Sequence, residues 1–140
     1  MTVQPTQTTA LERGRDLIAR MNPDLERVLA ERYDEHLPSF AETLIEQAYG
    51  RHYARDGLDL KTRQIATVAA LTALGGQTGP QLAINIEHAL AAGASEREVL
   101  EVIYQMAIYG GMPAAINGLN TAIALFEERR KTASARAFQG

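Results

Sequence analysis

The chain has 140 residues, a length that suits a single domain with a sizeable hydrophobic core. Hydrophobic residues make up 46% of the chain and charged residues 22%, as in ordinary globular proteins, so we expect no disorder except at the ends. The net charge of −3 gives no electrostatic reason to bind nucleic acid, and the absence of cysteine excludes disulfides, thiolate metal sites and cysteine-based redox chemistry.

Helix caps, prolines and glycines divide the chain into a series of predicted helices. These helices are expected over about residues 8–21, 22–38, 39–57, 59–75, 80–92, 95–110 and 113–130. Ser39 with Glu42, and Ser95 with Glu98, have the spacing of capping boxes, in which two residues each satisfy a backbone N–H of the other. The two serines are therefore predicted to begin helices.

No segment alternates between apolar and polar residues for long enough to form a strand. The sequence therefore predicts an all-α fold, a single-domain bundle of six to seven helices over residues 8–131, with a flexible N-terminal tail at 1–7 and a C-terminal tail at 132–140. The N-terminal sequence MTVQPTQTTALERG lacks the basic start and apolar core of a signal peptide, and no apolar run is long enough to span a bilayer. We expect a cytoplasmic protein that has no membrane partner.

Several short motifs follow one another over residues 40–128. They are Tyr49-Gly50, Arg55, Gly57-Leu58-Asp59, Thr62-Arg63, an Ala/Leu-rich helix ending in Gly75, a Gly-x-Ser-x-x-Glu turn at 93–98 and a Tyr-x-Gly-x-Pro-Ala-Ala corner at 109–115. With these motifs the chain resembles the carboxymuconolactone decarboxylase family of the alkylhydroperoxidase-D-like superfamily. The resemblance implies an all-α homo-oligomer, a trimer or hexamer. It also implies one of two activities, decarboxylation in aromatic catabolism or reduction of peroxides.

The peroxidases of this superfamily carry Cys-x-x-Cys followed by a histidine, and the corresponding positions here are Thr78, Gln81 and Asn85. Peroxiredoxin-type activity is disfavoured, because a hydroxyl or amide cannot replace a thiolate nucleophile. Decarboxylases of the family usually have histidine at the position of Asn85. In this chain the histidine of that helix, His88, lies three residues further on.

Gln81, Asn85 and His88 are spaced by four and three residues, so they lie on one side of a helix. We interpret this polar stripe as the lining of a pocket. In a decarboxylation, His88 would act as acid or hydrogen-bond donor, with Asn85 and Gln81 as donors to the developing negative charge. The alternative is that the amides form hydrogen bonds across a subunit interface, because buried amides need partners.

Other residues are predicted to bind substrate. Arg63 or Arg55 would bind a substrate carboxylate, although Arg63 could instead form a salt bridge at its helix start. Tyr49 and Tyr109 could turn a hydroxyl into the pocket or serve as core or interface aromatics. The histidines lack His-x₃-His spacing and acidic companions, so no metal site is expected. The resemblance to the family's decarboxylases implies a reaction that needs neither a metal nor an organic cofactor.

The sequence thus favours an enzyme of the carboxy-lyase (decarboxylase) type, free of cofactors, whose small-molecule substrate is a lactone or a β-keto-type carboxylic acid. The alternative is a non-catalytic oligomeric binding or structural protein of the same fold. A buried His88 facing a closed pocket would favour the enzyme, and a pocket filled by side chains would favour the binding protein.

Overall fold

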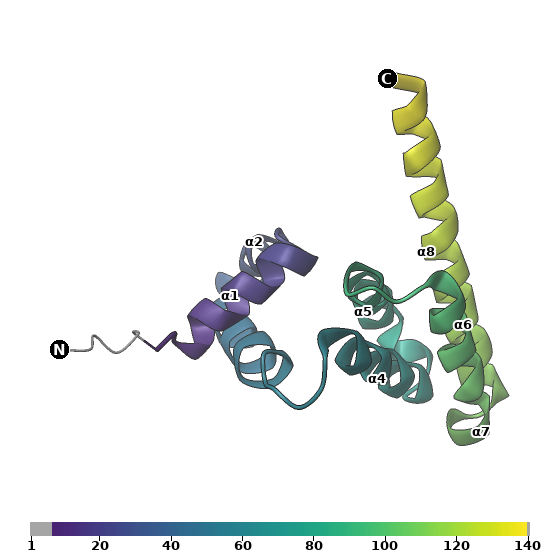
Figure 1. Cartoon of the computed structure of the whole chain (residues 1–140), viewed down its shortest axis with the longest axis horizontal. Helices are drawn as coiled ribbons and strands as arrows, with labels where there is room; N and C mark the ends of the chain where they lie inside the picture. The colour runs from purple at the N-terminus through teal and green to yellow at the C-terminus, as the bar shows by residue number, and fades with distance from the viewer. Residues whose placement is uncertain (1–6, 140) are drawn as a thin grey trace. The chain divides into compact units, whose positions relative to one another are not determined.

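The computed structural model of the chain describes residues 7–139, with Gln139 placed only as part of its helix. Every regular element in this range is a helix, so the predicted all-α fold is confirmed (Figure 1). Residues 1–6 of the predicted N-terminal tail, and Gly140, lie outside the described residues. In the part that is described, no helix is both long enough and apolar enough to cross a membrane.

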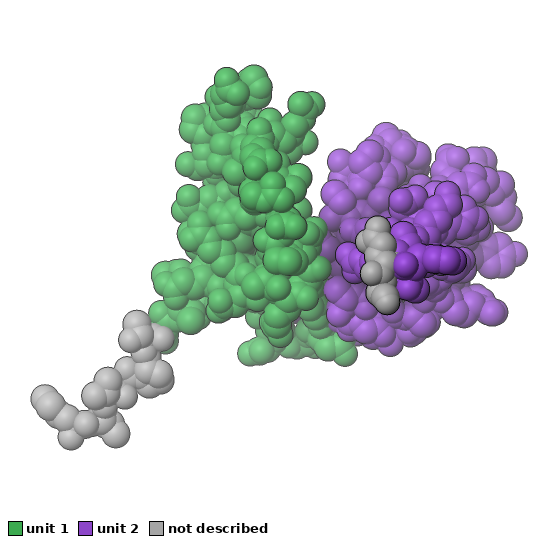
Figure 2. Space-filling model, turned by 90° about the horizontal axis from the view of Figure 1, so that it is seen from above, with its two compact units in different colours: residues 1–60 green, residues 61–140 purple. Residues whose placement is uncertain are grey.

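The chain forms two compact units, residues 1–60 and 61–140, where the sequence predicts one domain (Figure 2). Each unit has its own cluster of buried apolar side chains. Helical periodicity shows which face of a helix is buried, but it does not show which helices share a core. The sequence pattern therefore does not indicate the division into two compact units.

Unit 1 is a set of short helical segments. They are α1 (Ala10–Met21), α2 (Leu25–Leu29), the π-helical η1 (Ala30–Asp34), α3 (Phe40–Leu44) and the π-helical η2 (Ile45–Tyr53). Helix α1 begins as predicted, with the Thr9 side chain accepting a hydrogen bond from the Glu12 N–H at 3.1 Å. It packs closely on η2, because a Cβ on Gly50 would collide with the carbonyl oxygen of Ala10. The core of this unit is formed by Leu17, Ile18, Leu25, Ile45 and Tyr49.

Unit 2 contains a glycine-rich turn and a long C-terminal helix. Its elements are α4 (Leu60–Ala73), the 3₁₀ turn η3 (Gly76–Thr78), α5 (Gly79–Ala91), α6 (Glu96–Gln105), α7 (Ala107–Gly110) and α8 (Met112–Gln139). Helices α5 and α6 both pack against α8 (Figure 1). The core contains Val68, Leu82, Ile86, Ala89, Ala94, Val99, Ile103, Ala122 and Phe126.

Two predicted helix ends differ in detail from the structure. Helix α8 continues to Gln139, where the sequence predicts a tail from residue 132. The segment 131–139 contains three alanines and neither glycine nor proline, so nothing in it ends a helix. Ser39 adopts a left-handed conformation (φ 67°) and makes no side-chain cap, whereas the Ser95–Glu98 capping box forms as predicted.

Candidate functional site

The predicted polar stripe of α5 runs from the surface into the core of unit 2. Gln81 is exposed, Asn85 is half-buried, and His88 is 0% exposed. The Asn85 side-chain amide donates to the backbone carbonyl of Gln81 at 2.8 Å, which keeps it against its own helix. The three side chains therefore differ in their access to solvent, and only His88 is fully enclosed.

Burial determines the charge of His88. Removing an imidazole from water penalises its protonated form, so the pKa of His88 lies below its usual value of 6.5. The ring is consequently neutral at neutral pH, with one N–H to donate and one nitrogen to accept. Two roles are predicted for His88, acid and hydrogen-bond donor. The neutral state of its ring favours the role of donor.

The sequence interpretation missed Gln64 on α4. This side chain is 0% exposed, and neither Nε2 nor Oε1 of its amide has a hydrogen-bond partner among the described residues. Gln64, Val68 and Thr72 follow one another at intervals of four and are all buried. A glutamine in register with the apolar face of an Ala-rich helix is the signal that could have found it.

Gln64 and His88 are placed similarly with respect to the turn between α4 and α5. Gln64 lies nine residues before the last residue of α4, Ala73, and His88 lies nine residues after the first residue of α5, Gly79. At 1.5 Å per residue, each side chain is about 13 Å from the turn along its helix. Each of these two buried side chains therefore lies about two and a half turns from the glycine-rich turn along its own helix.

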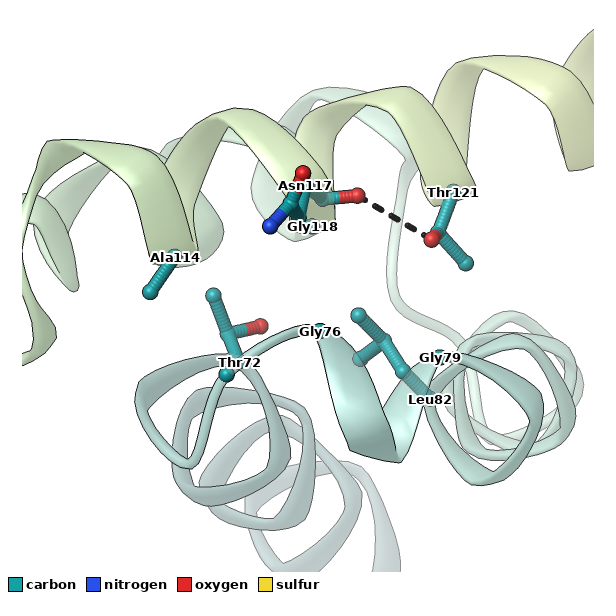
Figure 3. A pocket seen from close by; sticks show the side chains of 9 residues that line it. Thr72, Gly76, Gly79, Leu82, Ala114, Asn117, Gly118 and Thr121 are labelled. Atoms are coloured by element: carbon teal, nitrogen blue, oxygen red, sulfur yellow. Dashed lines mark hydrogen bonds between the residues drawn. The ribbon is translucent and has the colours of Figure 1, made fainter.

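A pocket of about 300 Å³ lies at the opposite end, where the turn meets α8 (Figure 3). Glycines 75, 76 and 79 form one side of it and Gly118 belongs to the other. The remaining lining residues are Thr72, Leu82, Ala114, Asn117 and Thr121. None of the residues predicted to bind substrate lines this pocket, and it contains no ionisable side chain.

The other predicted residues are divided between the two units. In unit 2, Arg63 is half-buried on α4 and Tyr109 is 76% exposed on α7. In unit 1, Tyr49 is buried against Tyr53 with ring centroids 5.3 Å apart, and burial raises the pKa of its hydroxyl well above the usual range. Arg55 is exposed in the same unit, so the predicted set does not form one cluster within either unit.

Arg55 has cationic neighbours within unit 1. It lines a hollow together with Arg13 and Arg51, and Arg51 pairs with Glu46 at 3.0 Å.

Over the described range of the chain, no group of three histidines or acidic residues is arranged to hold a metal ion.

Comparison with known proteins relates this architecture to a family. The model of the "Carboxymuconolactone decarboxylase family" matches residues 38–124. An "Uncharacterized 15.0 kDa protein in nqo9-nqo10 intergenic region" of Paracoccus denitrificans is 36% identical over 84% of this chain and 88% of its own length.

Two named decarboxylases are also similar. The "4-carboxymuconolactone decarboxylase" of Acinetobacter baylyi is 30% identical over 58% of this chain, and the "Nitrosuccinic acid decarboxylase npaB" of Metarhizium robertsii is 30% identical over 56%. The aligned segments span only 59% and 53% of the lengths of these two proteins. The family match covers more than half of the chain and includes the last part of unit 1, the glycine-rich turn and α5. The chain belongs to the carboxymuconolactone decarboxylase family.

Proposed function

We propose that this protein is a cofactor-free carboxy-lyase that decarboxylates a small lactone or β-keto-type carboxylic acid. Its family and its similarity to two proteins named as decarboxylases support this reaction class. The observation that carries the proposal for the site is the burial of Gln64 and His88, which with Thr72 are the buried polar side chains among the described residues of unit 2. A buried amide without hydrogen bonds is destabilising, so its presence is best explained by a role in binding or catalysis.

The proposed decarboxylation needs hydrogen-bond donors that are themselves uncharged. When the C–CO₂ bond breaks, its electron pair moves into the conjugated carbonyl group and negative charge develops on the oxygen. The Gln64 amide offers N–H donors and the imidazole of His88 is held neutral by its burial, and a donor aimed at such an oxygen stabilises the transition state by a few kcal/mol. The carbon then takes a proton from a water molecule, and the hydroxide that is left passes to the solvent.

A non-catalytic binding protein is the second candidate. The observation in its favour is that His88 is 0% exposed, because a catalytic residue must touch its substrate. In this reading the polar side chains of α4 and α5 are structural, and the fold serves assembly or ligand binding alone. The two candidates differ in whether any carboxylic acid loses CO₂.

Carbon dioxide release provides the test. The purified protein is incubated with 4-carboxymuconolactone, acetoacetate or nitrosuccinic acid, with and without EDTA. We expect CO₂ release from at least one acid, unaffected by the chelator. His88→Ala should lower kcat about a hundredfold or more, the usual scale for a positioned catalytic group.

Three further variants assign the roles of individual residues. Asn85→Ala should lower the rate less and act more on KM, and Asn85→His, which restores the residue usual in the family, should increase turnover of 4-carboxymuconolactone. His52→Ala, at an exposed histidine of unit 1, should keep the parent rate. A His88→Ala variant as fast as the parent would remove His88 from the mechanism, and three inert acids would favour the binding protein.

We also propose that the protein is a homo-oligomer, a trimer or hexamer, that acts in the cytoplasm in aromatic catabolism. Exposed large apolar side chains of unit 2 support the assembly. They include Tyr104, Ile108, Tyr109, Met112, Ile116 and Ile123. Soluble proteins rarely leave a large apolar area uncovered.

A further inference from the structure

The pocket between the glycine-rich turn and α8 holds a second site, separate from the proposed decarboxylation. We infer that it binds a small uncharged molecule that carries hydroxyl or amide groups. Its volume is about 300 Å³. One water molecule takes up about 30 Å³ of liquid, so a ligand of up to roughly ten non-hydrogen atoms fits this space.

The polar groups on the pocket wall are neutral, and most of them accept hydrogen bonds (Figure 3). Thr72 donates its hydroxyl hydrogen to the carbonyl of Val68 at 2.8 Å, and Thr121 donates to the carbonyl of Asn117 at 3.1 Å. Both hydroxyl oxygens therefore keep lone pairs that accept from a ligand. The Asn117 side chain is exposed and adds both an NH₂ donor and a carbonyl acceptor.

The same wall disfavours ions. No lining side chain carries a charge, so an ion here would be removed from water without a counter-ion. Leu82 and Ala114 give the pocket an apolar part, which a ligand with a short hydrocarbon portion would cover. The pocket thus matches a molecule with a small apolar body and one or two polar groups that donate hydrogen bonds.

Gly79 supplies an independent argument for an occupant. Its φ of −49° and ψ of −50° are helical, so its backbone conformation does not require glycine. A Cβ at this position would meet no atom within 4 Å, so packing does not require glycine either. Because Gly79 lines the pocket, the missing side chain leaves room for a ligand.

His88 does not line this pocket. The lining residues of α5, Gly79 and Leu82, are nine and six residues from His88, about 13 and 9 Å along the helix axis. A ligand that fills the pocket is therefore held by other residues than His88. The inference therefore stands or falls independently of the decarboxylase proposal.

A titration followed by ¹H–¹⁵N NMR tests the inference with two probes of equal size. Isobutyramide is neutral, and isobutyrate carries a negative charge that no lining side chain compensates. We expect isobutyramide to shift the amide resonances of Gly76, Gly79 and Gly118 in a saturable way, and isobutyrate to leave them unshifted. Equal shifts with both probes, or no saturable shift with isobutyramide, would overturn the inference.

Variants locate the binding to the pocket. Gly79→Val places a side chain in the pocket from a position where a Cβ meets no atom within 4 Å, and it should weaken isobutyramide binding at least about tenfold. Asn117→Leu removes the amide and should do the same. Ala91→Val places the same side chain at an exposed position of α5, and this variant should bind the probe like the parent. Parent-like binding by a folded Gly79→Val protein would contradict the assignment, and its NMR spectrum reports whether it is folded.

Discussion

Gln64 shows at the scale of one residue how stability and function can oppose each other. Its amide is fully buried and makes no hydrogen bond to a described residue. Leaving such a group unpaired costs a protein about 1–3 kcal/mol. A side chain of the same length without polar atoms would avoid this cost, so the structure alone does not favour glutamine here.

We therefore predict that Gln64→Met stabilises the protein and abolishes its activity. The free energy of unfolding in urea should rise by about 1–3 kcal/mol, because methionine fills a similar volume without an amide to desolvate. CO₂ release should fall at the same time. Gln105→Met, at an exposed glutamine of α6, should change neither quantity. A large loss of stability in Gln64→Met would mean that the amide is hydrogen-bonded in solution.

His88 makes stability depend on pH. Burial lowers its pKa below 6.5, so below pH 6.5 the unfolded chain binds a proton that the folded protein does not. Stability should fall as the pH drops below 6.5, with a slope of up to about 1.4 kcal/mol per pH unit from this residue, and the effect should vanish above that pH. Urea unfolding between pH 5 and 8 measures the slope.

The variant His88→Gln should flatten that profile. His52→Gln, which removes an exposed histidine, should leave the profile of the parent unchanged. If the two variants and the parent shared one slope, His88 would have to be accessible to protons in the folded state.

At the scale of the element, the two serines predicted to cap helices differ in their geometry. Ser95 accepts a hydrogen bond from the Glu98 N–H at 3.0 Å, and Glu98 accepts one from the Ser95 N–H at 2.9 Å. Ser39 is left-handed and caps nothing, and the Asp34 carboxylate accepts the hydrogen bond of the Ala41 N–H at 3.0 Å instead. One serine is therefore part of a capping box, and the other is not.

We predict that Ser95→Ala lowers the free energy of unfolding by about 1 kcal/mol, the usual cost of losing a side-chain cap. Ser39→Ala should change it by less than about 0.5 kcal/mol, because no hydrogen bond is lost. The measurement is urea unfolding at neutral pH. Equal losses in the two variants would show that Ser39 caps α3 in solution.

These elements show what the sequence can and cannot predict. Local signals fixed the helical class, the start of α1 and the Ser95 box, since a cap depends on residues three positions apart. The failure at Ser39 arises from Asp34, a tertiary competitor that is seven residues away along the chain from the N–H it binds. The burial of His88 and Gln64 and the pocket beside α8 also depend on which helices pack together, and one sequence does not contain that information.

At the scale of the whole molecule, the distribution of charge bears on assembly. No charged residue occurs between Glu101 and Glu127, a stretch that includes the end of α6, all of α7 and the first half of α8. Several large apolar side chains in this stretch are exposed, most strongly Ile108 at 79% and Tyr109 at 76%. An uncharged apolar face does not repel a second copy of itself, and a symmetric contact would cover both copies at once.

We therefore predict that light scattering at micromolar concentration gives a mass that is a multiple of 15.3 kDa. Ile108→Glu should reduce the mass toward that of one chain, because it places a charge in a face that assembly would remove from water. Val28→Glu adds the same charge to an exposed apolar position of unit 1 and should leave the mass unchanged. Because Ile108 is largely exposed in the single chain, its substitution should not disturb the fold, and circular dichroism should confirm equal helix content. A monomeric mass for the parent protein would contradict the predicted assembly.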